Sequence, residues 1–440
     1  MRKRTVLATR TERILKPLPD RSAIPERVQE AISRLKEDGH LAYIVGGAVR
    51  DLMLEGRTDD WDVATSALPG RVMELFPRNS AMGERHGSVM AVFDEGTVDI
   101  TTFRTEGAYS DKRRPDEVAF VKSIEGDLSR RDFTVNAMAW DPFTGGLIDP
   151  FGGISDLKSG FLRTVGDPLE RFSEDALRMM RALRFMSALC FTVQGEVIEA
   201  IKVARSGIEK VSAERKSVEL GRMITGKCAG GALALFIETG LAAEVLPGLD
   251  EAGLRKAARH MDELPADPLV RLAALLSCGD PTGPHRVDAN IKARADELKL
   301  SRIAKAHMAK LSESLFDGYM LGDGPSIRRW AALLGWDAVE DGITIRSWYD
   351  RHMRNKGDWK ADVERIRKVL DEKPPLTFEE MAIRGTDLVK LTGFAGPKVK
   401  ALLNKLFLDV LDAPELNTKE RLTMLAWVYL KGQDVGGVRQ

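Results

Sequence analysis

The sequence predicts an α+β protein whose N-terminal part is a mixed sheet with helices and whose remainder is helical throughout. Short apolar runs that read as strands lie between helical spacings only in the first part of the chain. The second half is rich in leucine, alanine, arginine and glutamate, and aromatic content is only 6%. The 440 residues are enough for two to four domains and a sizeable core.

Composition narrows the class of protein. Lys plus Arg and Asp plus Glu both number 66, so the net charge is zero. That balance is mild evidence against a nucleic-acid partner, unless the charges are segregated by face. No apolar run reaches membrane-spanning length, so no membrane partner is expected, and no protein partner is evident. The basic N-terminus lacks an apolar signal core, which makes a cytoplasmic location the default expectation.

Cysteine and histidine spacing gives no metal motif. Cys190, Cys228 and Cys278 lie far apart among apolar residues, and an odd number of cysteines suits a reducing compartment. The six histidines form no pair with metal-ligand spacing, and an adjacent His-Asp signature is absent.

The first elements lead into a glycine turn. Residues 1–25 read as an irregular basic lead-in, and residues 26–38 as an amphipathic helix. A short buried strand over 43–45 then meets Gly46 and Gly47, and helical spacing resumes over 48–54. Two glycines at a helix start leave backbone N–H groups open and let a phosphate approach closely.

Two carboxylates follow on the next predicted strand. Asp60 and Asp62 are two residues apart, so they share a strand face. They repel each other unless a cation lies between them, and hard oxygen ligands beside a phosphate site favour Mg²⁺. A pair of such ions would activate an attacking hydroxyl and neutralise a leaving pyrophosphate. The alternative is a tight turn followed by an acidic loop.

These residues resemble a known superfamily. Gly-Gly, a helix and Asp-x-Asp on a strand are similar to the nucleotidyltransferases that include DNA polymerase β. The string Val-Gly-Gly-Ala-Val-Arg-Asp at 45–51 narrows the resemblance to the class II tRNA nucleotidyltransferase and poly(A) polymerase family. The resemblance implies a polymerase β-like head with two Mg²⁺ ions at Asp60 and Asp62, and nucleotide contacts at Gly46, Gly47 and Arg50.

The head continues through a short helix over 71–76 and strands over 89–93 and 98–104. Asp99 on the last strand is either a third metal carboxylate or a solvated strand residue. Residues 105–118 have no periodicity and read as a mobile loop. In the family the matching segment is a flexible loop needed for adding the terminal A, and its residues here are Tyr109, Asp111, Arg113 and Arg114.

A second motif is Arg-Arg-Asp-Phe-Thr-Val-Asn-Ala at 130–137. Asp132 is predicted to begin a helix, with Asn136 one turn on and on the same side. Arg130 and Arg131 precede it and could reach a triphosphate. In the family, the second arginine and the Asp/Asn pair hold the phosphates and sugar of the nucleotide.

A third motif spans 171–185 and reads as one helix that begins after Ser173, its predicted N-cap. Asp175 and Arg178 would then be neighbours on one face, either as a plain ion pair or as a base-selecting pair. A carboxylate accepts from the exocyclic amine of C or A, and a guanidinium donates to the ring nitrogen; G and U reverse that pattern. The family assigns Glu-Asp-x-x-Arg this role. Nucleotide contacts of Arg181 and Arg184 follow from the resemblance.

The rest of the chain is predicted to be helical. A break at 226–231 is hinge-like, and the body helices are expected near 232–239, 268–277, 289–298, 302–315 and 327–334. A glycine-rich turn at 393–396 brings Lys398 and Lys400 to a helix start. These lysines either bind RNA phosphate or belong to a structural hairpin. The predicted parts are a lead-in (1–25), head (26–160), neck (161–228), body (229–345) and tail (346–440).

The resemblance is strong over 41–220 and continues more weakly to the end of the chain. It implies a CCA-adding tRNA nucleotidyltransferase of the Bacillus type. CTP and ATP would bind between head and neck, and the 3′ end of tRNA would attack the α-phosphate. An A-adding enzyme would carry the same motifs. A poly(A) polymerase and an inactive RNA-binding relative are the further alternatives.

Overall fold

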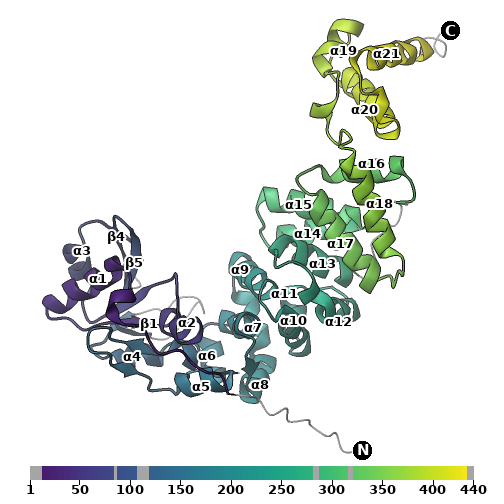
Figure 1. Cartoon of the computed structure of the whole chain (residues 1–440). Coiled ribbons are helices and arrows are strands. Elements are labelled where there is room, and N and C mark those ends of the chain that lie inside the picture. The colour runs from purple at the N-terminus through teal and green to yellow at the C-terminus, as the bar shows by residue number, and fades with distance from the viewer. Residues whose placement is uncertain (1–11, 84–86, 107–117, 281–286, 316–320, 434–440) are drawn as a thin grey trace, which may run out of the picture. The chain divides into compact units, whose positions relative to one another are not determined.

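The computed structural model describes residues 12–83, 87–106, 118–280, 287–315 and 321–433. The chain forms two compact units, Met1–Pro247 and Gly248–Gln440. Figure 1 shows that the first unit contains the sheet and its helices, whereas the elements labelled in the second are all helices. The predicted α+β class with a helical remainder is confirmed.

Seven of the described strands form one mixed sheet. β2 pairs in parallel with β5, and the other neighbouring strands are antiparallel. Each strand is short. The central strands β1 and β2 are buried except at Tyr43 and Asp62, which are partly exposed. The order across the sheet is β3 (Asn79–Gly83), β4 (Ser88–Phe93), β5 (Gly96–Thr102), β2 (Asp62–Thr65), β1 (Ala42–Val45), β8 (Ala139–Trp140) and β9 (Leu147–Ile148).

Helices cover the sheet because each has an apolar stripe. In α1 (Glu26–Glu37) the buried residues Val28, Ala31, Ile32 and Leu35 recur at helical spacing. α1 contacts β5, and α3 (Pro69–Leu75) contacts β4 (Figure 1). A further core cluster joins β1 and β2 to α4 (Ile124–Ser129) through Val45, Ala64 and Leu128. The sheet therefore holds its strand ends, where the motifs lie, on a rigid support.

Smaller elements complete the sheet region. β6 (Arg104–Glu106) pairs with β7 (Val118–Phe120), and β10 (Phe161–Leu162) pairs with β11 (Thr192–Val193). The predicted strand over 98–104 therefore ends earlier, at Thr102. The remaining helices here are η1 (Arg21–Ala23), α2 (Gly47–Glu55), η3 (Thr134–Asn136) and α5 (Gly153–Ser159).

The rest of the first unit is helical. α7 (Leu177–Leu189) packs against α9 (Ala213–Ile224) and α10 (Ala229–Glu238), as Figure 1 shows. Around them lie α6 (Pro168–Glu174), α8 (Gly195–Ala204), η4 (Arg205–Lys210) and α11 (Leu241–Val245).

The predicted break at 226–231 is confirmed only in its first part, because α10 already begins at Ala229, and the turn that follows α9 is closely packed. A Cβ at Gly226 would lie 2.2 Å from the Ser187 hydroxyl oxygen, so only glycine allows this approach to α7. The Ser187 hydroxyl donates to the carbonyl of Met223 at 2.6 Å.

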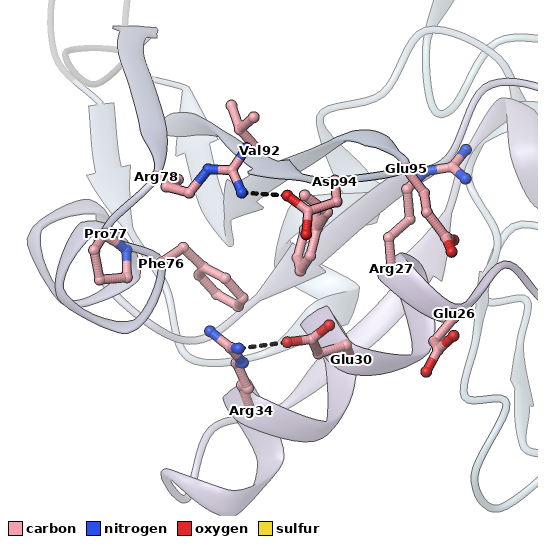
Figure 2. Close-up of a pocket in the computed structure, with 11 residues that line it drawn as sticks. Glu26, Arg27, Glu30, Arg34, Phe76, Pro77, Arg78, Val92, Asp94 and Glu95 are labelled. Atoms are coloured by element: carbon pink, nitrogen blue, oxygen red, sulfur yellow. Dashed lines mark hydrogen bonds and ion pairs between the residues drawn. The ribbon is translucent and has the colours of Figure 1, made fainter.

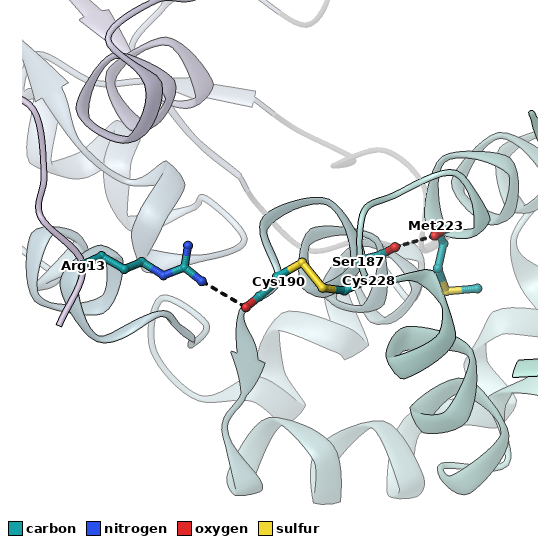
Figure 3. The surroundings of a disulfide bond; sticks show 5 residues. All are labelled: Arg13, Ser187, Cys190, Met223 and Cys228. Atoms are coloured by element: carbon teal, nitrogen blue, oxygen red, sulfur yellow. Dashed lines mark hydrogen bonds between the residues drawn. A yellow bond between two sulfur atoms is a disulfide. The ribbon is translucent and has the colours of Figure 1, made fainter. Parts of the chain in front are cut away.

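A disulfide joins Cys190, at the end of α7, to Cys228, at the start of α10 (Figure 3). The expectation of a reducing compartment, drawn from the odd number of cysteines, did not anticipate this bond. They are 38 residues apart in sequence, and the packing of α10 on α7 brings them together. Arg13 of the basic lead-in donates to the Cys190 carbonyl at 3.1 Å.

The second unit has two further apolar clusters. One is built around the fully buried Trp330, and the other around Leu388, Leu406 and Leu422. Its elements are α12 (Glu251–His260), η5 (Met261–Glu263), α13 (Pro268–Gly279), α14 (Val287–Glu297), α15 (Arg302–Ser314), α16 (Gly324–Leu334), α17 (Val339–His352), α18 (Trp359–Asp371), η6 (Phe378–Glu380), α19 (Gly385–Thr392), α20 (Pro397–Asp412), η7 (Pro414–Leu416) and α21 (Lys419–Gln433).

The division into lead-in, head, neck, body and tail stays a prediction. The two compact units meet at 247/248, and α17 runs through the predicted boundary at 345/346. Among the described residues, no helix is both long and apolar enough to cross a bilayer.

Candidate active site

A cleft of about 540 Å³ in the first unit collects the motif residues. It is lined by nine arginines and four aspartates, so its lining is strongly basic although the whole chain is neutral. This segregation of charge removes the objection to a nucleic-acid or nucleotide ligand. The predicted site residues that line the cleft are Gly46, Gly47, Arg50, Asp60, Asp62, Arg131, Asp132, Asn136, Asp175, Arg178, Arg181 and Arg184.

The glycine turn forms one wall. Gly46 has φ +70°, and a Cβ there would lie 2.7 Å from the Arg131 guanidinium, so both conformation and space require glycine. The Gly46 N–H donates to the Met138 carbonyl at 3.1 Å, so this amide is not open as expected. Helix α2 begins at Gly47, and its Arg50 is held by Asp51 and by Asn136.

The two carboxylates lie where a strand begins. Strand β2 starts at Asp62, so Asp60 precedes the strand and the predicted longer strand is wrong at that point. Both residues nevertheless line the cleft. Asp99 is exposed and stands opposite Asp62 in the parallel β2–β5 register, but it is not among the cleft-lining residues. Its two interpretations remain open.

The electrostatics of these carboxylates favour binding of a cation. Burial raises the pKa of Asp62 to about 6, and the charges of Asp60 and Asp99 add to that effect against the opposing Arg131. The pKa of Asp99 is also raised, by burial and then by Asp60. Carboxylates that destabilise one another's ionised forms are typical of a site that binds a cation.

Arg131 is fixed by a carboxylate beneath it. Its guanidinium lies 3.1 Å from the fully buried Asp127, which Arg130 also contacts at 2.7 Å. Burial alone would raise the pKa of Asp127, but Arg131 and Arg130 outweigh it and hold the pKa below its usual range. Both arginines are thus positioned by one buried charge, at the cleft wall.

Asp132 does not begin a helix, which corrects the prediction. Phe133 after it is extended, and only a short 3₁₀ turn covers Thr134–Asn136. The expected neighbour relation is confirmed, because the Asn136 side-chain amide donates to Asp132 Oδ1 at 3.1 Å. Arg181 contacts Oδ2 of Asp132 at 2.6 Å. Burial opposes the charge of Asp132, but Arg181 and Asn136 lower its pKa to about 2.

Glu219 of α9 supports the arginines of α7. Its carboxylate lies 2.8 Å from Arg184 and 3.9 Å from Arg181. Burial nevertheless lowers the pKa of Arg184 to about 10. Burial thus outweighs the nearby carboxylates of Glu219 and Asp132, so Arg184 is electrostatically suited to a further negative charge, such as a phosphate.

The third motif is not one helix. α6 ends at Glu174, Asp175 is extended, and α7 begins at Leu177. Asp167, not Ser173, caps α6. The break has a local cause: the Asp175 carboxylate accepts from the Leu177 N–H at 3.0 Å, a side-chain contact that competes with helix continuation.

This break changes the partners of the expected Asp175–Arg178 pair. Asp175 accepts from Arg215 of α9 at 2.8 Å. Arg178 contacts Glu174 at 2.5 Å and donates to the Arg130 carbonyl at 3.1 Å. Both side chains therefore line the cleft from separately braced positions.

Four residues of the cleft region were not predicted from the sequence: three arginines that line it and one glutamate that contacts two of the predicted arginines. Arg104, Arg215 and Arg222 line the cleft, and Glu219 braces two others. The helical motif Ala-Glu-Arg-Lys-Ser-Val-Glu at 213–219 was the available signal, since Arg215 and Glu219 are one turn apart on α9.

Two predicted groups lie elsewhere. Tyr109, Asp111, Arg113 and Arg114 fall outside the described residues. Lys398 and Lys400 are exposed in the first turn of α20, with Pro397 at the predicted first helical position. They belong to the second unit and stay a prediction.

A second pocket, of about 430 Å³, lies between α1 and the β4–β5 hairpin (Figure 2). Two ion pairs lie in it, Arg34 with Glu30 and Arg78 with Asp94. None of the three motifs lines it, and we assign it no function.

The sheet and basic cleft define a nucleotidyltransferase, and comparison with known proteins identifies its kind. The model of the poly A polymerase head domain matches residues 42–163. That of the probable RNA and SrmB-binding site of polymerase A matches residues 190–252.

Full-length relatives narrow this to one family. The CCA-adding enzyme of Geobacillus stearothermophilus is 37% identical over 404 residues, which cover 90% of this chain and 95% of that protein. The CCA-adding enzyme of Anoxybacillus flavithermus is 36% identical over 415 residues, with 90% and 96% covered. The crystal structure of the Bacillus stearothermophilus CCA-adding enzyme with CTP matches with a TM-score of 0.76 at 32% identity, over 94% of this chain and 100% of that one. The chain belongs to the family of CCA-adding enzymes, which are metal-dependent nucleotidyltransferases.

Proposed function

We propose that this chain adds C, C and A in turn to the 3′ end of tRNA, using CTP and ATP without a nucleic-acid template. The observation that carries the proposal is the cleft in which Asp60 and Asp62 face an arginine-rich wall. Full-length relatives carry the name CCA-adding enzyme, and one of them was crystallised with CTP. A Thermotoga maritima relative of the same fold was solved with tRNA.

Asp60 and Asp62 are the proposed ligands of two Mg²⁺ ions. Their chemistry fits, because burial and then the charge of Asp60 raise the pKa of Asp62, and hard carboxylate oxygens favour a hard divalent cation. Bound Mg²⁺ would activate the attacking hydroxyl and neutralise charge on the leaving group. Asp99, in register with Asp62, is a third candidate ligand.

The arginines are proposed to hold the triphosphate in line with the tRNA 3′-hydroxyl. That oxygen attacks the α-phosphate, the bond to the β-phosphate oxygen breaks, and pyrophosphate leaves. Arg131, fixed by Asp127, and Arg184, whose charged form burial disfavours, suit the phosphates. Asp132 and Asn136 together offer a carboxylate and an amide to the sugar.

Asp175 and Arg178 are the proposed base-selecting pair. Asp175 would accept from the exocyclic amine of C or A, and Arg178 would donate to the neighbouring ring nitrogen. The wrong base leaves a charged group without a partner, which costs about 1–3 kcal/mol or more. Arg215 holds Asp175 and Glu174 holds Arg178, so both groups are fixed in position without pairing with each other.

Incubating the purified protein with tRNA that ends before CCA, after C, or after CC tests the function. CTP alone should extend the first two substrates, and ATP alone should extend the third by one residue. Extension of only the third would identify an A-adding enzyme, whereas long A tails would identify a poly(A) polymerase. No extension of any substrate with Mg²⁺ would favour an inactive RNA-binding relative.

A cytoplasmic location is proposed with the function. The Cys190–Cys228 disulfide argues against this location, because disulfides are rare in the reducing cytoplasm. Alkylating free thiols in intact cells before lysis, then counting modified cysteines by mass spectrometry, tests whether the bond forms there.

A further inference from the structure

Three potential metal ligands meet in the second unit, far in sequence from the cleft motifs. His260 ends α12, Glu263 ends η5, and His352 ends α17. One ligand atom of each lies within 4.8 Å of the other two. Sequence spacing could not reveal this group, because α17 follows α12 by almost 80 residues and joins it only through packing.

Hydrogen bonds organise the three side chains. The Nδ1–H of His260 donates to Glu263 Oε1 at 2.9 Å, and the Nε2–H of His352 donates to Oε2 at 3.0 Å. The imidazole rings stack with centroids 3.8 Å apart. The Trp348 indole N–H donates to the His260 carbonyl at 2.9 Å, and Lys256 of α12 donates to the Met353 carbonyl at 2.8 Å. Both helix ends are therefore held together independently of the cluster.

We propose that His260, Glu263 and His352 bind a divalent transition-metal ion, with Zn²⁺ as the best match. Two imidazoles and one carboxylate are borderline ligands that Zn²⁺ prefers to Mg²⁺. Zn²⁺ bonds of about 2.0–2.2 Å in a tetrahedron place donor atoms roughly 3.3 Å apart. The two imidazole nitrogens lie 2.9 Å from Oε1 and 3.0 Å from Oε2 of Glu263. The three ligand atoms lie within 4.8 Å of one another, so side-chain movement alone would bring them to the spacing that the ion needs. Water would complete the coordination.

Binding requires two small rearrangements. Each imidazole moves its proton to the other ring nitrogen, which leaves a lone pair towards the ion. The stacked rings must also tilt, because parallel rings do not aim their nitrogens at one point. His260 is the ring free to turn, since its side chain is 33% exposed, whereas His352 is 8% exposed.

Arg351 would compete with the metal ion for the Glu263 carboxylate. Its guanidinium lies 3.1 Å from Glu263 Oε2, and its side chain is 50% exposed. An exposed arginine can swing into water, where its charge is well solvated. Its presence weakens a cation site without blocking it. The ion would link α12 and η5 to α17, so its role would be to stabilise the second unit, and the proposal does not depend on the function of the cleft.

Calorimetric titration of the full-length, chelator-treated protein with Zn²⁺, in Mg²⁺ that saturates the cleft carboxylates, tests the proposal. Wild type should bind one Zn²⁺ and unfold at higher temperature when it does. Glu263→Gln and His260→Ala, both at partly exposed positions, should weaken binding at least about tenfold, which is about 1.4 kcal/mol. Arg351→Gln should tighten it several-fold.

His307→Ala is the matched control, because His307 is another histidine of this unit that contacts a carboxylate, Asp341, at 3.0 Å. It should bind Zn²⁺ like wild type. Circular dichroism should show all variants folded. Absence of saturable Zn²⁺ binding by wild type would overturn the proposal, as would equal affinity of wild type, Glu263→Gln and His260→Ala. The three residues would then be only a hydrogen-bonded link between helices.

Discussion

Arg215 of α9 holds the carboxylate of Asp175, with Nη2 of the arginine 2.8 Å from Oδ2. The second oxygen of Asp175 accepts the Leu177 N–H at 3.0 Å. The carboxylate is thus fixed from two sides at the junction of α6 and α7, although each oxygen keeps capacity for a further hydrogen bond. A residue 40 positions away in sequence therefore orients the group proposed to read the base.

Replacing Arg215 should impair base selection without stopping chemistry. Arg215→Ala frees the Asp175 carboxylate to turn, so KM for CTP and ATP should rise more than kcat falls. Arg215→Lys, which keeps the charge, should restore part of the loss. Steady-state kinetics with both nucleotides measures this. Unchanged KM in Arg215→Ala would mean that the Leu177 amide alone positions Asp175.

Arg178→Ala should narrow the gap between accepted and rejected nucleotides. The expected loss of discrimination is about 10-fold to 100-fold, the cost of one unpaired polar group in a closed site. The measurement is kcat/KM for CTP, ATP, UTP and GTP. Arg131→Ala is the comparison, since a phosphate contact should weaken all four alike. Full discrimination in Arg178→Ala would reduce its contact with Glu174 to a structural ion pair.

Shortening residues 106–114 should block A addition and spare C addition. The segment is charged and glycine-rich, and it resembles the family's flexible loop. Incorporation of C on tRNA lacking CCA and of A on tRNA ending in CC, measured on the same variant, decides this. C addition is the internal control for folding, and equal loss of both activities would point to a structural loop.

Breaking the Cys190–Cys228 disulfide should destabilise the first unit. Closing 38 residues of chain contributes about 2–4 kcal/mol. Calorimetric unfolding with and without a thiol reductant should show the transition of wild type falling in reductant. Cys190→Ser should no longer respond, whereas Cys278→Ser, which changes the free cysteine, should respond like wild type. An oxidised wild-type protein that ignores reductant would contradict this.

The features predicted correctly from the sequence are those that local residue patterns determine. The glycine turn before α2, the carboxylates at the start of β2, and the apolar stripe of α1 all depend on neighbours within a few residues. Every predicted nucleotide-binding residue lines one cleft, because the motifs fall at strand and helix ends that the sheet brings together.

The features that the sequence did not predict depend mostly on contacts between residues far apart in the chain. A helical pattern over 171–185 hid the break at Asp175, where a side chain replaces the next backbone hydrogen bond. Arg215, Glu219 and the Cys190–Cys228 bond act across helices whose packing no spacing rule encodes. The pairing of His260 with His352 has the same origin.

The central claim is that Asp60 and Asp62 carry metal-dependent nucleotide addition. Single-turnover addition of C to tRNA lacking CCA should be measured for Asp60→Asn and Asp62→Asn, with Asp59→Asn, an exposed neighbour that does not line the cleft, as the matched control. Losing a metal ligand should remove several kcal/mol of barrier lowering, so both variants should slow more than about a hundredfold while Asp59→Asn keeps its rate. Addition at a near-wild-type rate by folded Asp60→Asn or Asp62→Asn would contradict the account.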